Sequence, residues 1–136
     1  MIRIVVDTNL LIAGRWKPES ASNRVLDMCL EGVVQAVYSP KTKDENLFIL
    51  GKVKAPKDYV DKVIRFYNAS VHMTPKEKIN VIKENQSDNR FLEVAVEGNA
   101  DYVISSDHHL LDVKEYKGVK IIKPSEFIRI IEKMIP

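Results

Sequence analysis

The feature that most constrains the fold is the first segment, where an apolar strand runs directly into a carboxylate. Four of the five residues from Ile2 to Val6 are β-branched and apolar, a composition typical of a strand buried on both faces. Asp7 follows where this strand should end. Because open α/β sheets bind ligands at the carboxyl ends of their strands, Asp7 is a candidate functional residue. A helix cap formed by Asp7, Thr8 and Asn9 is the alternative that these residues alone leave open.

The rest of the chain alternates predicted strands with predicted helices. Apolar residues recur at helical spacing in several segments, and short runs rich in β-branched residues separate them. The predicted strands are 2–6, 33–38, 69–73, 101–105 and 119–123. The predicted helices are 10–13, 20–31, 41–50, 56–67, 87–97 and 124–134, with Gly51 as the stop of the third and Ser87 as the cap of the fifth. This alternation predicts an α/β fold, a three-layer α/β/α sandwich with a mostly parallel central sheet.

Composition limits the classes of protein that this chain can belong to. Its 136 residues fit a single domain, residues 1–136, and 45% hydrophobic with 29% charged residues shows no signature of disorder. No apolar run approaches the roughly 20 residues of a membrane span, and the start lacks the cleavage pattern of a signal peptide. We therefore expect a cytoplasmic protein without a membrane anchor. The single cysteine, Cys29, excludes an internal disulfide and a cysteine-clustered zinc site.

Nucleotide-binding enzymes of the Gly-rich loop type are also excluded. The chain has five glycines, and each of them ends or joins a predicted element. None is left for a loop that cradles phosphates, so Walker-type nucleotide binding and a dinucleotide-binding site both lack their necessary residues.

Four acids are predicted at the ends of elements along one edge of the sheet. Asp7 and Asp107 each follow a strand, Glu45 lies in helix 41–50, and Asp88 opens helix 87–97. Two carboxylates about 4 Å apart repel by about 4 kcal/mol at an effective dielectric constant near 20, so such a cluster needs protons or cations. Oxygen ligands alone favour Mg²⁺ or Mn²⁺ over zinc. A metal held by carboxylates, without a nucleotide loop, suits hydrolysis of a phosphodiester.

Each acid also has a purely structural interpretation. Asp88 beside a helix start can simply interact with the helix dipole. Asp44 and Glu45 can form one solvated helix face, and their spacing alone does not decide which of them points inward. His108 and His109 are more typical of surface groups than of ligands, because they are not spaced as a ligand pair.

Basic residues are placed where they can hold phosphates. Between positions 41 and 65, seven lysines and arginines face four acids, although an ordinary solvated surface has the same pattern. Trp16 is expected to pack at the rim, and a base-stacking role beside Arg15 is the alternative. The candidate substrate-binding residues are Arg15, Lys43 and Arg90.

Several segments together resemble a known family. They are Val5-Val6-Asp7-Thr8-Asn9, Ser39-Pro40 followed by Glu45, Ser87 to Ala95, Ala100 to Leu111, and the ending Val119 to Phe127. Their order and spacing are similar to those of a PIN domain, and most similar to the members described as toxin components of toxin–antitoxin systems. The resemblance covers nearly the whole chain. It implies a Rossmann-like α/β/α sandwich, a metal-dependent ribonuclease activity, a homodimer and a small antitoxin protein as partner.

The resemblance also implies roles for individual residues. The implied metal-binding and catalytic acids are Asp7, Glu45, Asp88 and Asp107. Asn9 or Ser105 would orient them through hydrogen bonds. The chain departs from the family pattern at Asn85, where relatives often carry an acid, and at Ser106, which replaces the usual glycine.

The hypothesis that follows is an endoribonuclease that cleaves RNA with Mg²⁺ or Mn²⁺. One alternative is a catalytically weak PIN domain that acts as an RNA-binding or scaffold module, which the departure at Asn85 keeps open. Another is a phosphatase of the haloacid dehalogenase type, which also begins with an aspartate after its first strand. It fits poorly, because Asn9 stands where its general-acid aspartate belongs.

Overall fold

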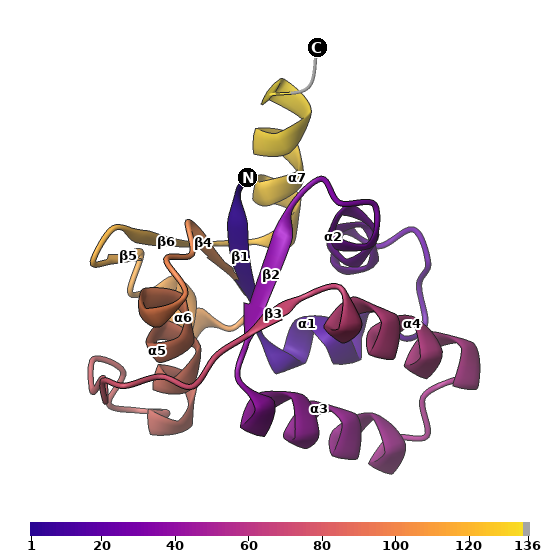
Figure 1. The fold of residues 1–136 in the computed structure, drawn as a ribbon, viewed down its shortest axis with the longest axis horizontal. Coiled ribbons are helices and arrows are strands. Elements are labelled where there is room, and N and C mark those ends of the chain that lie inside the picture. The colour runs from indigo at the N-terminus through magenta and orange to yellow at the C-terminus, as the bar shows by residue number, and fades with distance from the viewer. Residues whose placement is uncertain (135–136) are drawn as a thin grey trace.

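A six-stranded sheet forms the centre of the computed structural model, which describes residues 1–134 (Figure 1). Its strands are β1 (Arg3–Val6), β2 (Gln35–Tyr38), β3 (Val71–His72), β4 (Tyr102–Ile104), β5 (Glu115–Tyr116) and β6 (Val119–Ile122). They lie in the order β3-β2-β1-β4-β6-β5, and all neighbours pair in parallel except β5 and β6. The predicted α/β fold with a mostly parallel sheet is confirmed.

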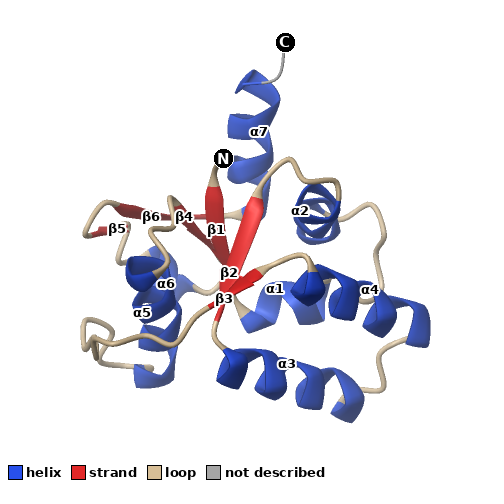
Figure 2. Cartoon of the chain, viewed as in Figure 1, coloured by secondary structure: helices blue, strands red, loops and turns tan. Residues whose placement is uncertain are grey.

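Helices cover both faces of this sheet, so the molecule has three layers (Figure 2). The helices are α1 (Thr8–Ala13), α2 (Ala21–Leu30), α3 (Pro40–Lys52), α4 (Lys57–Asn68), α5 (Asn89–Glu97), α6 (His108–Leu111) and α7 (Pro124–Met134), with a 3₁₀ turn at Gln86–Asp88. Apolar residues of α1, α2, α4 and α7 form one core cluster, and those of α5 and α6 form the other. Within β1, Ile4 and Val6 join the first cluster and Val5 joins the second, as expected for a strand with two buried faces. No helix within residues 1–134 is both long enough and apolar enough to cross a membrane.

The connection between β3 and α5 is irregular, as its mixed sequence indicates, but it is held in place by one helix face. Three polar residues spaced four apart along α5 accept hydrogen bonds from backbone N–H groups of this connection. These bonds run from Lys76 to Glu97 (3.1 Å), from Ile79 to Glu93 (2.9 Å) and from Ile82 to Asn89 (2.9 Å). Since residues four apart share one helix face, a single row of side chains fixes the whole segment.

Two local predictions were wrong, and two short elements were missed. Gly51 does not end its helix but lies inside α3, and the chain reverses only at Lys54, which has a positive φ of 55°. Ser87 does not cap α5, because its hydroxyl donates to Asn85 from within the 3₁₀ turn. The short elements α6 and β5 were not predicted, and β5 exists because positive φ angles at Lys117 and Gly118 allow a tight hairpin with β6.

Two glycines give a matched test of the packing. A Cβ atom at Gly98 would lie 2.7 Å from Val37 Cγ1, whereas one at Gly51 would meet nothing within 4 Å. We expect Gly98→Ala to lower the free energy of unfolding by about 1–3 kcal/mol, because overpacking forces neighbours apart. Gly51→Ala is expected to raise it by roughly 0.5–1 kcal/mol, since alanine favours the helix. Urea denaturation measures both, and equal effects of the same sign would contradict the packing described here.

Candidate active site

The candidate site lies where the carboxyl ends of β1 and β4 meet. Val6 and Ile104, the last residues of these strands, are register partners, and the Asp7 N–H donates to the Ile104 carbonyl at 3.2 Å. The strand order reverses at this point, because β2 and β3 extend the sheet on one side of β1 while β4 and β6 extend it on the other. Such a reversal opens a crevice at the sheet edge, the usual ligand position in α/β folds.

Asp7 is both a helix cap and a buried charge. Its side chain accepts from the Leu10 N–H at 2.9 Å, which caps α1, and its other oxygen accepts from the Ser105 hydroxyl. The residue is only 1% exposed. Burial raises the pKa of Asp7 above its ordinary value, although the hydrogen bonds from Ser105 and Leu10 act in the opposite direction. The capping role does not account for a charge that is costly to bury, so Asp7 keeps its place as a functional candidate.

Ser105 joins Asp7 to Asp107. The Ser105 hydroxyl donates to Asp7 and accepts from the Asp107 N–H at 2.9 Å, and the serine is fully buried. Asp107 in turn caps α6 by accepting from the His109 N–H at 2.9 Å. The two aspartates after β1 and β4 are thus tied together through one hydroxyl.

Asp88 completes a group of three carboxyls. It ends the 3₁₀ turn before α5 and is 8% exposed, and the Asn85 amide donates to it at 3.0 Å. Burial, a hydrogen bond with Asp107 and the charges of Asp107 and Asp7 raise the pKa of Asp88 to about 6. Burial also opposes ionisation of Asp107, but hydrogen bonds from the His109 N–H and from Asp88 lower the pKa of Asp107 overall. Asp88 therefore keeps its proton to a higher pH than Asp107 does, as expected for two neighbouring carboxyls.

Glu45 is not in direct contact with this group. Its carboxylate accepts from Arg90 Nη1, while Arg90 Nη2 donates to the Thr8 hydroxyl at 3.3 Å. Glu45 is half-buried and the neighbouring Asp44 is exposed, so Glu45 is the residue of this pair that faces inward. The structure thus brings three of the four predicted acids together and places the fourth on an arginine next to them.

The other predicted residues are distributed around the site. The Asn9 side chain is exposed, and only its backbone N–H is directed at Asp7. Arg15 lies beyond the end of α1, where it donates to the Ile12 carbonyl at 2.6 Å and stands 5.3 Å from the Trp16 ring. Lys43 is half-buried on α3 and forms no ion pair within residues 1–134.

Two histidines next to the site were underestimated from the sequence. Asp107, His108 and His109 each offer a ligand atom, and these atoms lie within 4.8 Å of one another. His109 Nδ1 also lies 3.3 Å from Glu84. Adjacent histidines do not match any ligand spacing, so the sequence carried no signal for this group. The single turn of α6 brings them together.

The donor set suits a hard divalent cation. Asp7, Asp88 and Asp107 offer carboxylate oxygens at a sheet edge, and their mutual repulsion contributes to the raised pKa values of Asp7 and Asp88. A cation with oxygen ligands, such as Mg²⁺ or Mn²⁺, balances this charge more fully than a proton does. The nearby imidazoles are compatible with Mn²⁺, which accepts nitrogen ligands as well.

Comparison with known proteins fits this geometry. A family model described as a PIN domain matches residues 3–109, a range that contains β1 to β4 and all four predicted acids. The chain belongs to the PIN domain family. PIN domains are generally nucleases that use divalent metals, so a nuclease-type function follows from membership. This PIN domain is also 28% identical over 148 aligned residues to the uncharacterized protein MJ1680 of Methanocaldococcus jannaschii, with 98% of this chain and 94% of that protein covered.

Proposed function

We propose that this PIN domain is an endoribonuclease that hydrolyses RNA phosphodiester bonds with Mg²⁺ or Mn²⁺. The observation that carries the proposal is the convergence of Asp7, Asp88 and Asp107 at the β1/β4 edge, where Ser105 links Asp7 to Asp107 by hydrogen bonds and the charges of both reach Asp88. These three residues would hold the metal. A bound divalent cation would lower the pKa of an attacking water and neutralise the leaving oxygen.

The chain's own residues supply the orientation. Ser105 and the Leu10 N–H hold both oxygens of Asp7, so this carboxylate cannot rotate freely. The His109 N–H holds one oxygen of Asp107 in the same way. Ligands fixed by such bonds bind a metal with less loss of side-chain entropy, and the bonds also select its position.

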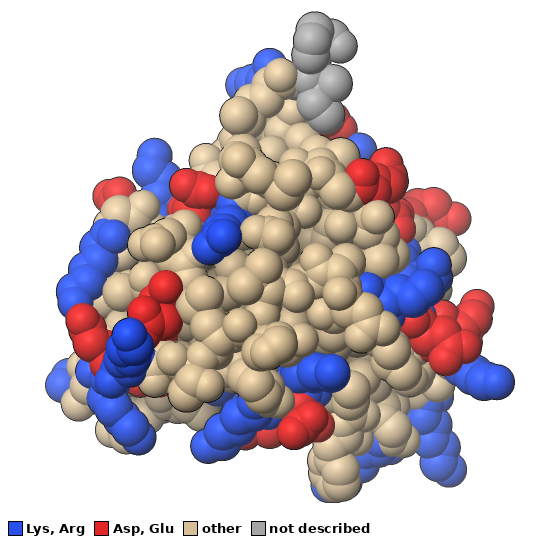
Figure 3. Space-filling model, in the orientation of Figure 1, with Lys and Arg blue, Asp and Glu red and all other residues tan. Residues whose placement is uncertain are grey.

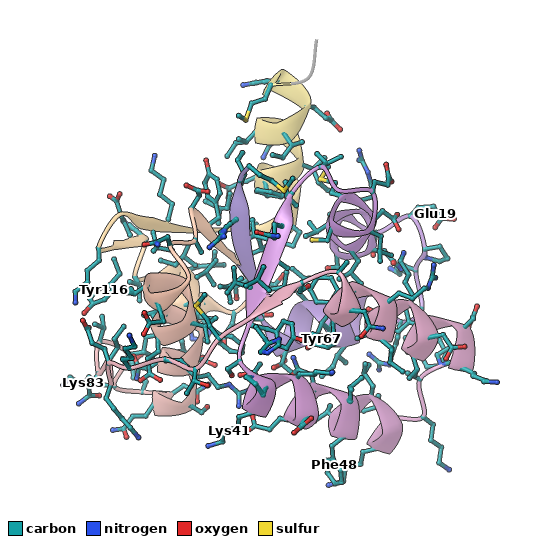
Figure 4. The ribbon with its side chains drawn as sticks, viewed as in Figure 1. Glu19, Lys41, Phe48, Tyr67, Lys83 and Tyr116 are labelled. Carbon is teal, nitrogen blue, oxygen red and sulfur yellow. The ribbon has the colours of Figure 1, made fainter. Side chains whose placement is uncertain are left out.

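Clefts beside the acids support a polyanionic substrate. Two adjoining clefts of about 470 Å³ each lie between α3 and α5, and both are lined by Lys41, Lys78 and Arg90. Figure 4 shows Lys41 at the start of α3, on the side that faces α5. Glu93 lines both clefts too, but its carboxylate is engaged with the Ile79 N–H.

The lysines of these clefts are free to meet phosphates. Lys41, Lys76 and Lys78 form no ion pair within the described part of the chain. Basic and acidic side chains are intermixed around the edge of the face seen in Figure 3, so local placement decides where a polyanion binds, and the net charge of +2 does not. A strand of RNA that passes over α3 and α5 would bring a phosphate to the three aspartates.

Cleavage of a labelled single-stranded RNA tests the proposal. We expect cleavage with Mn²⁺ or Mg²⁺ and none after chelation with EDTA, and no cleavage of a DNA of the same sequence. RNA binding without metal-stimulated cleavage would instead support a non-catalytic RNA-binding module. A chain that neither binds nor cleaves RNA in the presence of metal would overturn both.

The toxin role, an antitoxin partner and a homodimer stay predictions that rest on the family resemblance. A cytoplasmic location likewise stays a prediction.

A further inference from the structure

A chain of hydrogen bonds links the three segments that carry Asp7, Glu45 and Asp88. The Thr8 hydroxyl donates to Asn46 Oδ1 at 2.6 Å, and Asn46 Nδ2 donates to the Tyr67 hydroxyl at 2.8 Å. At the other end, Arg90 Nη2 donates to Thr8 at 3.3 Å and Nη1 donates to Glu45. Thr8 directly follows Asp7, Asn46 directly follows Glu45, and Arg90 stands two residues after Asp88.

The buried end of this chain fixes its direction. Asn46 is 1% exposed and Tyr67 is 2% exposed, and Figure 4 shows Tyr67 among α1, α3 and α4. Because Asn46 donates its amide N–H to Tyr67, its carbonyl oxygen is turned toward Thr8. The single hydroxyl hydrogen of Thr8 then goes to Asn46, which leaves the lone pairs of this oxygen for Arg90.

The Arg90 end depends on this hydroxyl. Arg90 Nε is buried and has no hydrogen-bond partner in the described residues, so only the two Nη groups hold the guanidinium by hydrogen bonds. The Phe91 ring, 4.9 Å from Arg90 Cζ, supports it without fixing its rotation. Without the bond to Thr8, the guanidinium can turn about its own axis and take the Glu45 carboxylate with it.

A purely structural role does not explain the cost of this arrangement. A buried amide that lacks its partners costs about 1–3 kcal/mol, and an apolar residue of similar size at position 46 would avoid that risk. Asn46 instead has both partners, and it joins a hydroxyl of the core, Tyr67, to Thr8 beside the site.

We propose that Thr8 and Asn46 are positioning residues, which hold the Arg90 guanidinium and through it set the place of the Glu45 carboxylate beside Asp7, Asp88 and Asp107. This inference rests on the proposed metal-dependent cleavage, which it extends to the placement of the fourth acid.

A matched pair of substitutions at Thr8 tests this role. Thr8→Val keeps the shape of the side chain and removes the hydroxyl, whereas Thr8→Ser keeps the hydroxyl. We expect Thr8→Val to lower kcat for RNA cleavage about tenfold with little change in KM, an effect typical of losing a residue that orients a metal ligand. The Mn²⁺ concentration at the midpoint of the metal-dependent rise in Tm should increase several-fold. Thr8→Ser should keep most of the wild-type kcat and a Mn²⁺ midpoint close to that of the wild type. Equal behaviour of the two variants would overturn the proposal.

A double-mutant cycle separates action through Glu45 from a general loss of packing. Glu45→Gln removes the carboxylate that Thr8, Asn46 and Arg90 are proposed to position. In that background, Thr8→Val should have no further effect on the Mn²⁺ midpoint, because both changes act through the Glu45 carboxylate. An undiminished effect of Thr8→Val would show that Thr8 acts elsewhere and would overturn the proposal.

Guanidinium NMR gives a readout that needs neither metal nor RNA. In the wild type, we expect separate ¹⁵N–¹H signals for Nη1 and Nη2 of Arg90, because each donates to its own partner. Thr8→Val should merge or broaden them and Thr8→Ser should not. If the protein neither binds Mn²⁺ nor cleaves RNA, the proposed function fails. The positioning role of Thr8 and Asn46 is then tested by these signals alone, and averaged Arg90 signals in the wild type would overturn it.

Discussion

Asp7→Asn is expected to lower metal-dependent RNA cleavage by at least about 100-fold, since a bound metal contributes several kcal/mol to the stabilisation of the transition state. Asparagine Oδ1 can still accept from the Leu10 N–H, so the cap of α1 is kept, and its amide N–H can donate to the Ser105 oxygen in place of the bond that Ser105 now donates. What is lost is the negative charge at the centre of the three carboxyls. The variant should therefore fold and yet fail to bind the cation.

The measurement has two parts. Initial rates of cleavage of a labelled RNA give the loss of activity, and the rise of Tm with Mn²⁺ gives the loss of binding, because a ligand of the folded state stabilises it by mass action. Asp101→Asn is the matched control. Asp101 precedes β4 at the opposite edge of the sheet and accepts from the Arg3 N–H at 2.9 Å, a bond that asparagine can also accept. Full activity of Asp7→Asn, or an equal loss in Asp101→Asn, would contradict the site.

The layers of this fold were predictable because each long element carries its own pattern. The predicted apolar positions Tyr59, Val63 and Tyr67 lie on the buried face of α4, although Ile64, also predicted there, is exposed. The β-branched run before Asp7 matches β1. The two-residue strand β5 and the four-residue helix α6 are too short to show any period. They form because of the tight turn at Gly118 and the cap at Asp107, which local hydrophobicity does not report.

The meeting of Asp7 and Asp107 was also predictable, since both follow parallel strands and such strands end at one edge. The pairing of Glu45 with Arg90 was not, because it depends on how α3 and α5 approach each other from different layers. The hydrogen bond from Thr8 to Asn46 is of the same kind. No spacing rule connects residues 38 positions apart, so only the three-dimensional structure reveals this hydrogen bond.

Asp88 should make the metal-free protein less stable as the pH rises. Its pKa is near 3.8 in an ordinary setting and about 6 in the folded protein, so the folded state binds more protons than the unfolded state between these values. The free energy of unfolding should therefore fall as the pH rises from about 4 to about 6, by an amount on the order of 1–2 kcal/mol once solvent screening at this edge is allowed for. Urea unfolding in EDTA across this range measures the slope.

Asp88→Asn should reverse the order of stability with and without metal. Asparagine carries no charge beside Asp107 and Asp7, so at pH 8 in EDTA the variant should melt a few degrees above the wild type. The loss of stability between about pH 4 and 6 should become smaller, and what is left of it comes from the raised pKa of Asp7. With saturating Mn²⁺ the wild type should melt higher, because only its carboxylate at position 88 can contribute to the binding free energy.

Asp112→Asn is the control. Asp112 is exposed and lies at the C-terminal end of α6, whereas Asp107 lies at its N-terminal end, so this change should alter neither the pH dependence of stability nor the rise of Tm with Mn²⁺. A variant of Asp88 that is less stable than the wild type in EDTA would show that this carboxylate serves the fold. A variant that is more stable in EDTA and still gains from Mn²⁺ as much as the wild type would remove Asp88 from the metal site. The variant should melt higher in EDTA and the wild type higher in Mn²⁺ only if the same charge, that of Asp88, both destabilises the metal-free protein by repulsion and binds the cation.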